Sequence, residues 1–182
     1  MNDFSTYESA DIVVVGAGLV GSLFVSEILD DFQKIALLDA GSNVHSSMKE
    51  VKTSGDFFHP SGDRYRCFGL GGSSSKWAGR CVIYDRQDFE LSDQWPIHYD
   101  EIYTYYDRAL KLLDAEVEIS DVQSLVDATG ELLPINQADF GRSFDIYSKP
   151  TNTYEKFSSR FNECHNLKIY HDHVVTSLDS CD

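Results

Sequence analysis

Apolar and polar positions follow a regular order in the first part of the chain. The run Ile12–Val15 is continuously apolar and β-branched, which is typical of a strand that a parallel sheet buries on both faces. Apolar residues then recur at helical spacing over residues 19–31, before a second apolar run at Ile35–Leu38. Residues 10–41 are therefore predicted to form a strand, a helix and a second strand.

The later part of the chain is less regular. Residues 42–66 have no clean period and are predicted to be irregular. Helices are expected at 99–113 and 153–164, and residues 167–178 alternate as a strand or a hairpin would. The predicted fold class is α/β, with a parallel sheet and flanking helices.

A glycine-rich turn, Gly16-x-Gly18-x-x-Gly21, joins the first predicted strand to the helix. In this spacing the first glycine allows a sharp turn, the second allows a pyrophosphate to approach the backbone, and the third allows the helix to pack on the strand. The helix would start at Leu19 and Val20 and present its N–H groups to the phosphates. The turn therefore predicts a dinucleotide site.

An acidic residue, Asp39, ends the second predicted strand and is followed by Ala40. A carboxylate at this place is suited to accept hydrogen bonds from both hydroxyls of an adenosine ribose, and it would repel the 2′-phosphate of NADP. A glycine turn that only connects a strand to a helix would require neither the spacing nor the acid. We therefore expect Asp39 and Ala40 to lie at the adenosine end of the site.

The amino-acid composition limits the classes of binding partner and the cellular compartment expected for the protein. The formal net charge of −15 argues against nucleic acid and anionic membranes as main partners, and 42% hydrophobic residues are enough to fill a core. The four cysteines form no CxxC motif, and His171 with His173 gives only two possible metal ligands. With no signal peptide or membrane-spanning run visible, we expect a cytoplasmic protein without a metal site.

A second glycine-rich segment occupies residues 66–80. Its backbone amides and hydroxyls could form a second anion-binding nest, which suggests a bulkier cofactor than NAD. A Ser/Gly surface linker is the alternative, but Phe68, Trp77 and the two flanking arginines crowd the loop. The residues expected to contact the cofactor in this segment are Arg66, Gly71, Gly72, Ser73, Ser74 and Ser75.

Together, Asp11-Ile-Val-Val-Val-Gly-Ala-Gly-Leu-Val-Gly21 and Gly69-Leu-Gly-Gly-Ser-Ser-Ser-Lys-Trp-Ala-Gly-Arg80 resemble the FAD-binding half of the glucose–methanol–choline oxidoreductases. The stretches 84–90 and 95–109 are similar to the branch of bacterial sugar and sugar-acid dehydrogenases. The resemblance is strongest over residues 10–110. For residues 1–182 it implies an FAD/NAD(P)-binding fold of the Rossmann type, and oxidation of an alcohol or sugar hydroxyl by hydride transfer to FAD.

The resemblance also implies roles for individual residues. The glycines of the turn match the family's pyrophosphate turn, Asp39 takes the place of its ribose-binding acid, and residues 71–75 match the loop that runs along the pyrophosphate and flavin. Val175 matches a position whose backbone contacts adenine. Lys76 stands where some relatives attach FAD through a histidine, so non-covalent FAD is implied.

The family's catalytic histidine and its partner lie in a C-terminal half, whereas this sequence ends at Asp182. We therefore expect an FAD-binding domain that is incomplete at its C-terminus, no catalytic residue in this chain, and a substrate domain outside it. The leading hypothesis is the FAD-binding portion of an oxidoreductase that acts on CH–OH groups of alcohols or carbohydrates. A non-catalytic or truncated FAD-binding module completed by a partner chain, and an NAD-binding Rossmann protein, are the alternatives.

Overall fold

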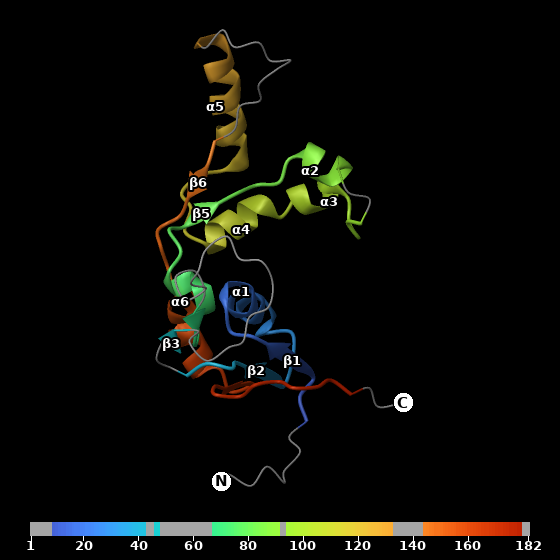
Figure 1. The fold of residues 1–182 in the computed structure, drawn as a ribbon, viewed down its shortest axis with the longest axis vertical. Helices are drawn as coiled ribbons and strands as arrows, with labels where there is room; N and C mark the ends of the chain where they lie inside the picture. The colour runs from blue at the N-terminus through green and yellow to red at the C-terminus, as the bar shows by residue number, and fades with distance from the viewer. Residues whose placement is uncertain (1–8, 43–45, 48–66, 92–93, 133–143, 180–182) are drawn as a thin grey trace. The chain divides into compact units, whose positions relative to one another are not determined.

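The computed structural model describes residues 9–42, 46–47, 67–91, 94–132 and 144–179 (Figure 1). They belong to two compact units. The first unit combines Met1–Trp77 with Pro150–Asp182, and the second unit is Ala78–Lys149.

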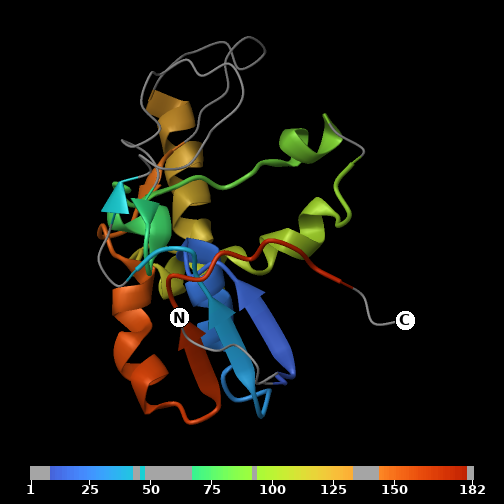
Figure 2. The same ribbon diagram turned by 60° about the horizontal axis from the view of Figure 1, so that its bottom comes forward.

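A three-stranded parallel sheet forms the centre of the first unit. Its strands lie side by side in the order β1 (Ile12–Val15), β2 (Ile35–Leu38) and β7 (Leu167–Tyr170) (Figure 2). In the register, Ile12 lies opposite Ile35, which in turn lies opposite Leu167. Helix α1 (Leu19–Ile28) connects β1 to β2, so the strand, helix and strand predicted for residues 10–41 are confirmed.

Helices α1 and α6 (Thr153–Glu163) pack together and cover one face of this sheet. The buried core under them consists of Ala17, Val25, Ile28, Leu29, Ile35, Leu37, Leu70 and Phe161. Along β1 only Ile12 and Val14 pack against this core, whereas Val13 and Val15 are 54% and 56% exposed. The expectation that this strand is buried on both faces is therefore wrong, because the helices cover only one side of it.

The helix predicted at residues 153–164 is confirmed as α6. Its N-terminus is capped by Asn152, whose Oδ1 accepts hydrogen bonds from the amides of Tyr154 and Glu155 at 3.0 and 3.3 Å. The strand predicted nearby ends at Tyr170, because Asp172 adopts a positive φ of 60° and turns the chain. The residues after this turn, up to 179, are irregular and not a second strand.

The remaining regular elements of the first unit are short. Strand β3 (Ser46–Ser47) pairs antiparallel with β4 (Cys67–Phe68), and the 3-10 helix η2 (Gly72–Ser75) follows. The irregular segment predicted at 42–66 lies mostly outside the described residues, as does Arg66.

The second unit is built from helices and a short antiparallel pair, β5 (Arg80–Cys81) with β6 (Ile146–Tyr147). Its helices are α2 (Arg86–Glu90), α3 (Tyr99–Tyr103), α4 (Tyr106–Leu112) and α5 (Ile119–Leu132). Its buried core consists of Leu110, Ala115, Ile119 and Ile146.

The single helix predicted over 99–113 is wrong in one respect, because the structure divides it into α3 and α4. At the break, the hydroxyl of Thr104 donates to the Glu101 carbonyl at 2.8 Å, and the Tyr105 amide donates to Ile102 in a tighter turn. Among the described residues, none of the helices is long and apolar enough to cross a membrane.

Candidate functional site

The glycine turn lies at the carboxyl end of β1 and leads directly into α1. Gly16 has φ +96°, which favours glycine, and its amide donates to the Leu38 carbonyl at 2.7 Å. A Cβ atom built on Gly16 or Gly18 would meet no atom within 4 Å, whereas one on Gly21 would overlap the Gly16 carbonyl. The first two glycines therefore face open space, and the third allows close packing of the helix on the strand, as predicted.

The start of α1 presents backbone donors beside this open space. Gly18 is the N-cap residue, and no side chain caps the helix. Among the described residues, the N–H groups of Leu19 and Val20 have no hydrogen-bond partner, and Val20 is 75% exposed. Such N–H groups, together with the helix dipole, favour a bound anion.

The predicted acid, Asp39, lies against the turn and is 9% exposed. Its Oδ2 accepts a hydrogen bond from the Ala17 amide at 2.7 Å, and its Oδ1 accepts one from the Gly41 amide at 2.8 Å. Each carboxylate oxygen can accept more than one hydrogen bond, so a ribose contact is still chemically open to it. The next residue, Ala40, is exposed.

The second glycine-rich segment is in direct contact with the first. The Gly71 amide donates to the Ala17 carbonyl at 2.7 Å. A Cβ on Gly72 would stand 3.0 Å from the Cα of Gly18, and one on Gly41 would overlap the backbone of Gly69. The structure thus brings the two segments singled out in the sequence to one place.

The three serines of this segment have different surroundings. Ser74 is buried, and its hydroxyl donates to the Gly71 carbonyl at 2.6 Å and lies 3.1 Å from Oγ1 of Thr153. The hydroxyl of Ser75 donates to the Gly72 carbonyl at 2.9 Å, whereas Ser73 is exposed. Ser74 therefore attaches the loop to α6, and Ser73 is the most accessible of the three hydroxyls.

Residues at the start of α6 complete this attachment, although no sequence motif singles them out. The Thr153 amide donates to Ser74 Oγ at 3.0 Å, and a Cβ on Gly71 would overlap the side chain of Asn152. The indole N–H of Trp77 donates to the Thr151 carbonyl at 2.9 Å. Asn152 could have been found as an N-cap before the predicted helix, but its contact with Gly71 depends on the tertiary fold.

The segment after β7 lies beside the residues at the end of β2 and is hydrogen-bonded to them. The Asp39 amide donates to the Tyr170 carbonyl at 2.8 Å, and the His173 amide donates to the Asp39 carbonyl at 2.9 Å. The Asp172 amide also bonds the Gly41 carbonyl at 2.9 Å. Val175, which is half-buried, lies further along this segment, so the predicted adenine-contacting stretch starts beside Asp39.

The histidines of this segment bond locally. Nδ1 of His171 lies 2.6 Å from Oδ2 of Asp172, and Nδ1 of His173 lies 2.5 Å from the His171 carbonyl. No group of three or more His, Cys, Asp or Glu side chains in the described ranges is arranged to hold a metal ion.

Of the two arginines that flank the second glycine-rich segment, the structure describes only Arg80. Arg66 lies outside the described residues. Arg80 makes a two-pronged ion pair with Asp145 at 2.8 and 2.9 Å, and the carboxylate raises the pKa of the guanidinium. Both partners of this pair belong to the second unit.

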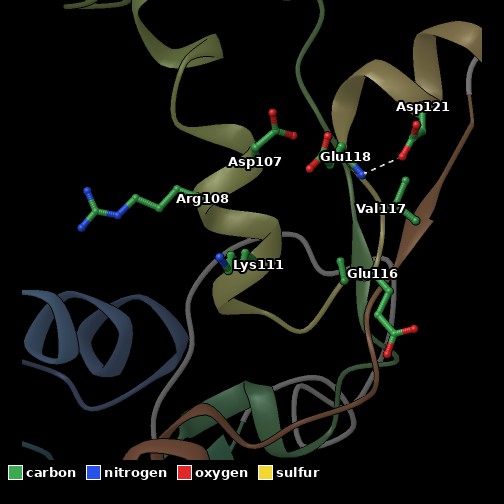
Figure 3. Close-up of a pocket in the computed structure, with 8 residues that line it drawn as sticks. Asp107, Arg108, Lys111, Glu116, Val117, Glu118 and Asp121 are labelled. Carbon is green, nitrogen blue, oxygen red and sulfur yellow. Dashed lines mark hydrogen bonds between the residues drawn. The ribbon is translucent and has the colours of Figure 1, made fainter.

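The second unit contains a surface hollow of about 660 Å³ (Figure 3). Two of its carboxylates bond backbone amides at the start of α5. Oδ1 of Asp107 accepts from Ile119 at 2.8 Å, and Oδ2 of Asp121 accepts from Glu118 at 3.3 Å. These bonds give Asp107 and Asp121 a structural role at the start of α5.

Neither a scan against models of known protein families nor a search of curated proteins finds a match to this chain. The geometry of the first unit and the two glycine-rich segments are therefore the features that point to a function.

Proposed function

We propose that the first unit binds FAD non-covalently and forms the cofactor-binding part of an oxidoreductase acting on CH–OH groups of alcohols or carbohydrates. The observation that carries the proposal is the open space beside Gly16 and Gly18, next to a helix start without a side-chain cap. The three parallel strands and their helices are compatible with an FAD/NAD(P)-binding Rossmann-type fold, which is part of the proposal.

A pyrophosphate fits the chemistry of this place. Among the described residues, the N–H groups of Leu19 and Val20 donate no hydrogen bond to the protein. The first turn of α1 contains no acidic side chain that could bond these groups or repel an anion. With no Cβ at Gly18, a phosphate oxygen can approach the backbone closely. The glycine turn and the start of α1 would therefore hold the pyrophosphate.

The two ends of the cofactor are proposed from what adjoins the turn. Asp39 and the segment that leads to Val175 lie at the carboxyl ends of β2 and β7, where an adenosine would bind. The second loop, at Gly71 and Gly72, touches the turn from another direction and would run along the pyrophosphate toward the flavin. The presence of two adjacent glycine loops favours FAD over NAD as the cofactor.

When bound, FAD would supply the hydride acceptor for the reaction. The residues named here would bind and orient it, and we assign none of the described residues a catalytic role. The substrate is proposed to be a small alcohol or a sugar. A non-catalytic FAD-binding module that works with a partner chain is the second candidate, and it is compatible with the same geometry.

Visible absorbance of the purified full chain tests the proposal. We expect yellow protein that releases flavin on denaturation, or colourless protein that is reconstituted by added FAD. Protein that binds NAD but not FAD would support the NAD-binding alternative, and protein that binds neither would contradict the proposal. Oxidation of sugars or alcohols with an artificial electron acceptor would separate an enzyme from a non-catalytic module.

The variant Gly18→Ala tests the proposed place of the pyrophosphate. Gly18 has φ −74°, and a methyl group there meets no protein atom within 4 Å, so the variant should fold with wild-type stability. The methyl group would fill the space that a phosphate needs, so we expect clearly weaker FAD binding. Unchanged FAD affinity would place the cofactor elsewhere.

A further inference from the structure

Hydrogen bonds hold both backbone groups of Ala17, which lies between the first two glycines of the turn. Its N–H donates to Asp39 Oδ2 at 2.7 Å. Its carbonyl accepts from the Gly71 amide at 2.7 Å and from the Ser22 hydroxyl at 3.0 Å. Ala17 is completely buried. The peptide groups on either side of Ala17 are therefore fixed by the protein itself.

This arrangement fixes the direction of the next amide. In a trans peptide the N–H and C=O bonds point in opposite directions. Because the Ala17 carbonyl points toward Gly71 and Ser22, the N–H of Gly18 must point away from them. The preceding peptide is oriented in the same way by Asp39, which draws the Ala17 N–H toward β2. The turn is thus set before any ligand arrives.

Asp39 is itself held firmly enough to orient the turn. Its second oxygen accepts from Gly41 at 2.8 Å, and its backbone bonds Tyr170 and His173 at 2.8 and 2.9 Å. Hydrogen bonds from backbone amides to a carboxylate are stronger than those between neutral groups. The carboxylate therefore links the glycine turn to the ends of β2 and β7.

We infer that Asp39 is a positioning residue for the phosphate-binding turn, acting through the Ala17 amide and not only through a ribose hydroxyl. The inference rests on the proposed function, because it concerns how that site recognises a dinucleotide. It distinguishes two roles for one carboxylate. A ribose contact matters only for ligands that have the hydroxyl, whereas orientation of the turn matters for every ligand whose pyrophosphate binds there.

Hydrogen exchange of the cofactor-free chain tests the positioning role directly. In the wild type, the Ala17 amide should exchange slowly, while those of Leu19 and Val20 exchange fast. Asp39→Asn should speed exchange at Ala17 by roughly tenfold or more, because the charge is removed and a single amide oxygen remains for the two backbone amides of Ala17 and Gly41. Wild-type exchange at Ala17 as fast as at Leu19 would overturn the inference, even if the variant failed to fold.

Asp11→Asn is the matched control. Asp11 also accepts two backbone amides, from Gln33 at 3.1 Å and Lys34 at 2.8 Å, but at the amino end of the same strands. Its substitution should speed exchange at those two amides and leave Ala17 as in the wild type. Equal effects of both variants at Ala17 would indicate general loosening of the sheet and would overturn a specific role for Asp39.

Binding of two forms of FAD then separates positioning from ribose contact. The probes are FAD and a dideoxy form of FAD whose adenosine ribose lacks both the 2′- and the 3′-hydroxyl. Asp39→Asn should weaken both by a similar factor, on the order of tenfold, and Asp11→Asn should weaken neither. If Asp39→Asn weakens the binding of FAD but not of the dideoxy form, Asp39 acts through a ribose contact alone. If the wild type binds neither form, the proposed function fails, and exchange at Ala17 still decides whether Asp39 holds the turn.

Discussion

Gly72 lies against Gly18 so closely that a Cβ on Gly72 would stand 3.0 Å from the Cα of Gly18. The contact joins two glycine-rich segments that are separated in the sequence by β2 and by the residues up to β4. Because both residues are glycines, no side chain of either stands between the two backbones at this contact. A ligand placed on the turn would therefore meet main-chain groups of both segments.

Gly21→Ala should destabilise the first unit. Its Cβ would overlap the Gly16 carbonyl, so α1 would have to move away from β1. Overpacking of this kind typically costs about 1–3 kcal/mol. Denaturant unfolding followed by circular dichroism measures the loss. Gly18→Ala is the control, because its methyl group would enter open space. Wild-type stability of Gly21→Ala would mean that helix and strand are less closely packed than described.

Ser74→Ala should also lower the free energy of unfolding. The hydroxyl bonds Gly71 and receives the Thr153 amide, and Thr153 is fully buried. A buried amide left without its partner costs roughly 1–3 kcal/mol. Ser73→Ala is the matched control, since Ser73 is exposed. Equal stability of the two variants in denaturant would argue against the attachment of this loop to α6.

Asn166→Asp should weaken the link between α1 and β7. The side-chain amide of Asn166 donates to the carbonyls of Leu29 and Phe32 at 2.7 and 2.6 Å, just after α1 ends. A carboxylate cannot donate and would face two acceptors, so we expect a loss of about 1–3 kcal/mol. Asn162→Asp, at an exposed position of α6, should cost less. Thermal unfolding of both variants measures the difference.

Stability should fall at alkaline pH partly because of Tyr154. Burial raises the pKa of this phenol above its ordinary value of 10.0, since the charged form is disfavoured in the folded chain. The contribution is therefore fully present below pH 10.0 and is lost as pH rises through the higher folded-state pKa. Unfolding midpoints over this range should fall less steeply in Tyr154→Phe. Identical slopes in variant and wild type would contradict the assignment.

Local chemistry allowed the glycine turn to be predicted. The need for a positive φ at Gly16 and for close packing at Gly21 follows from spacing alone, since both are set within one strand, turn and helix. Periodicity does not reveal the division of the predicted helix at Thr104, because the hydroxyl of Thr104 competes for a backbone carbonyl.

Other features depend on contacts between distant residues. The sequence predicts a ribose contact for Asp39, but nothing in it indicates that the amides of Ala17 and Gly41 donate to its carboxylate. The pairing of Ser74 with Thr153 likewise depends on how the second loop meets α6. These contacts arise from the tertiary fold, so residue type and spacing could place the candidate site but not its internal bonds.

The strand order of the sheet has a consequence for synthesis on the ribosome. β2 pairs on one side with its near neighbour β1, and on the other with β7, which follows the entire second unit in the chain. During translation, one edge of β2 stays unpaired until β7 has been synthesised, and unpaired strand edges can pair with other chains. Asp39 likewise lacks its bonds to Tyr170 and His173 until then, so the nascent chain completes this end of the site late.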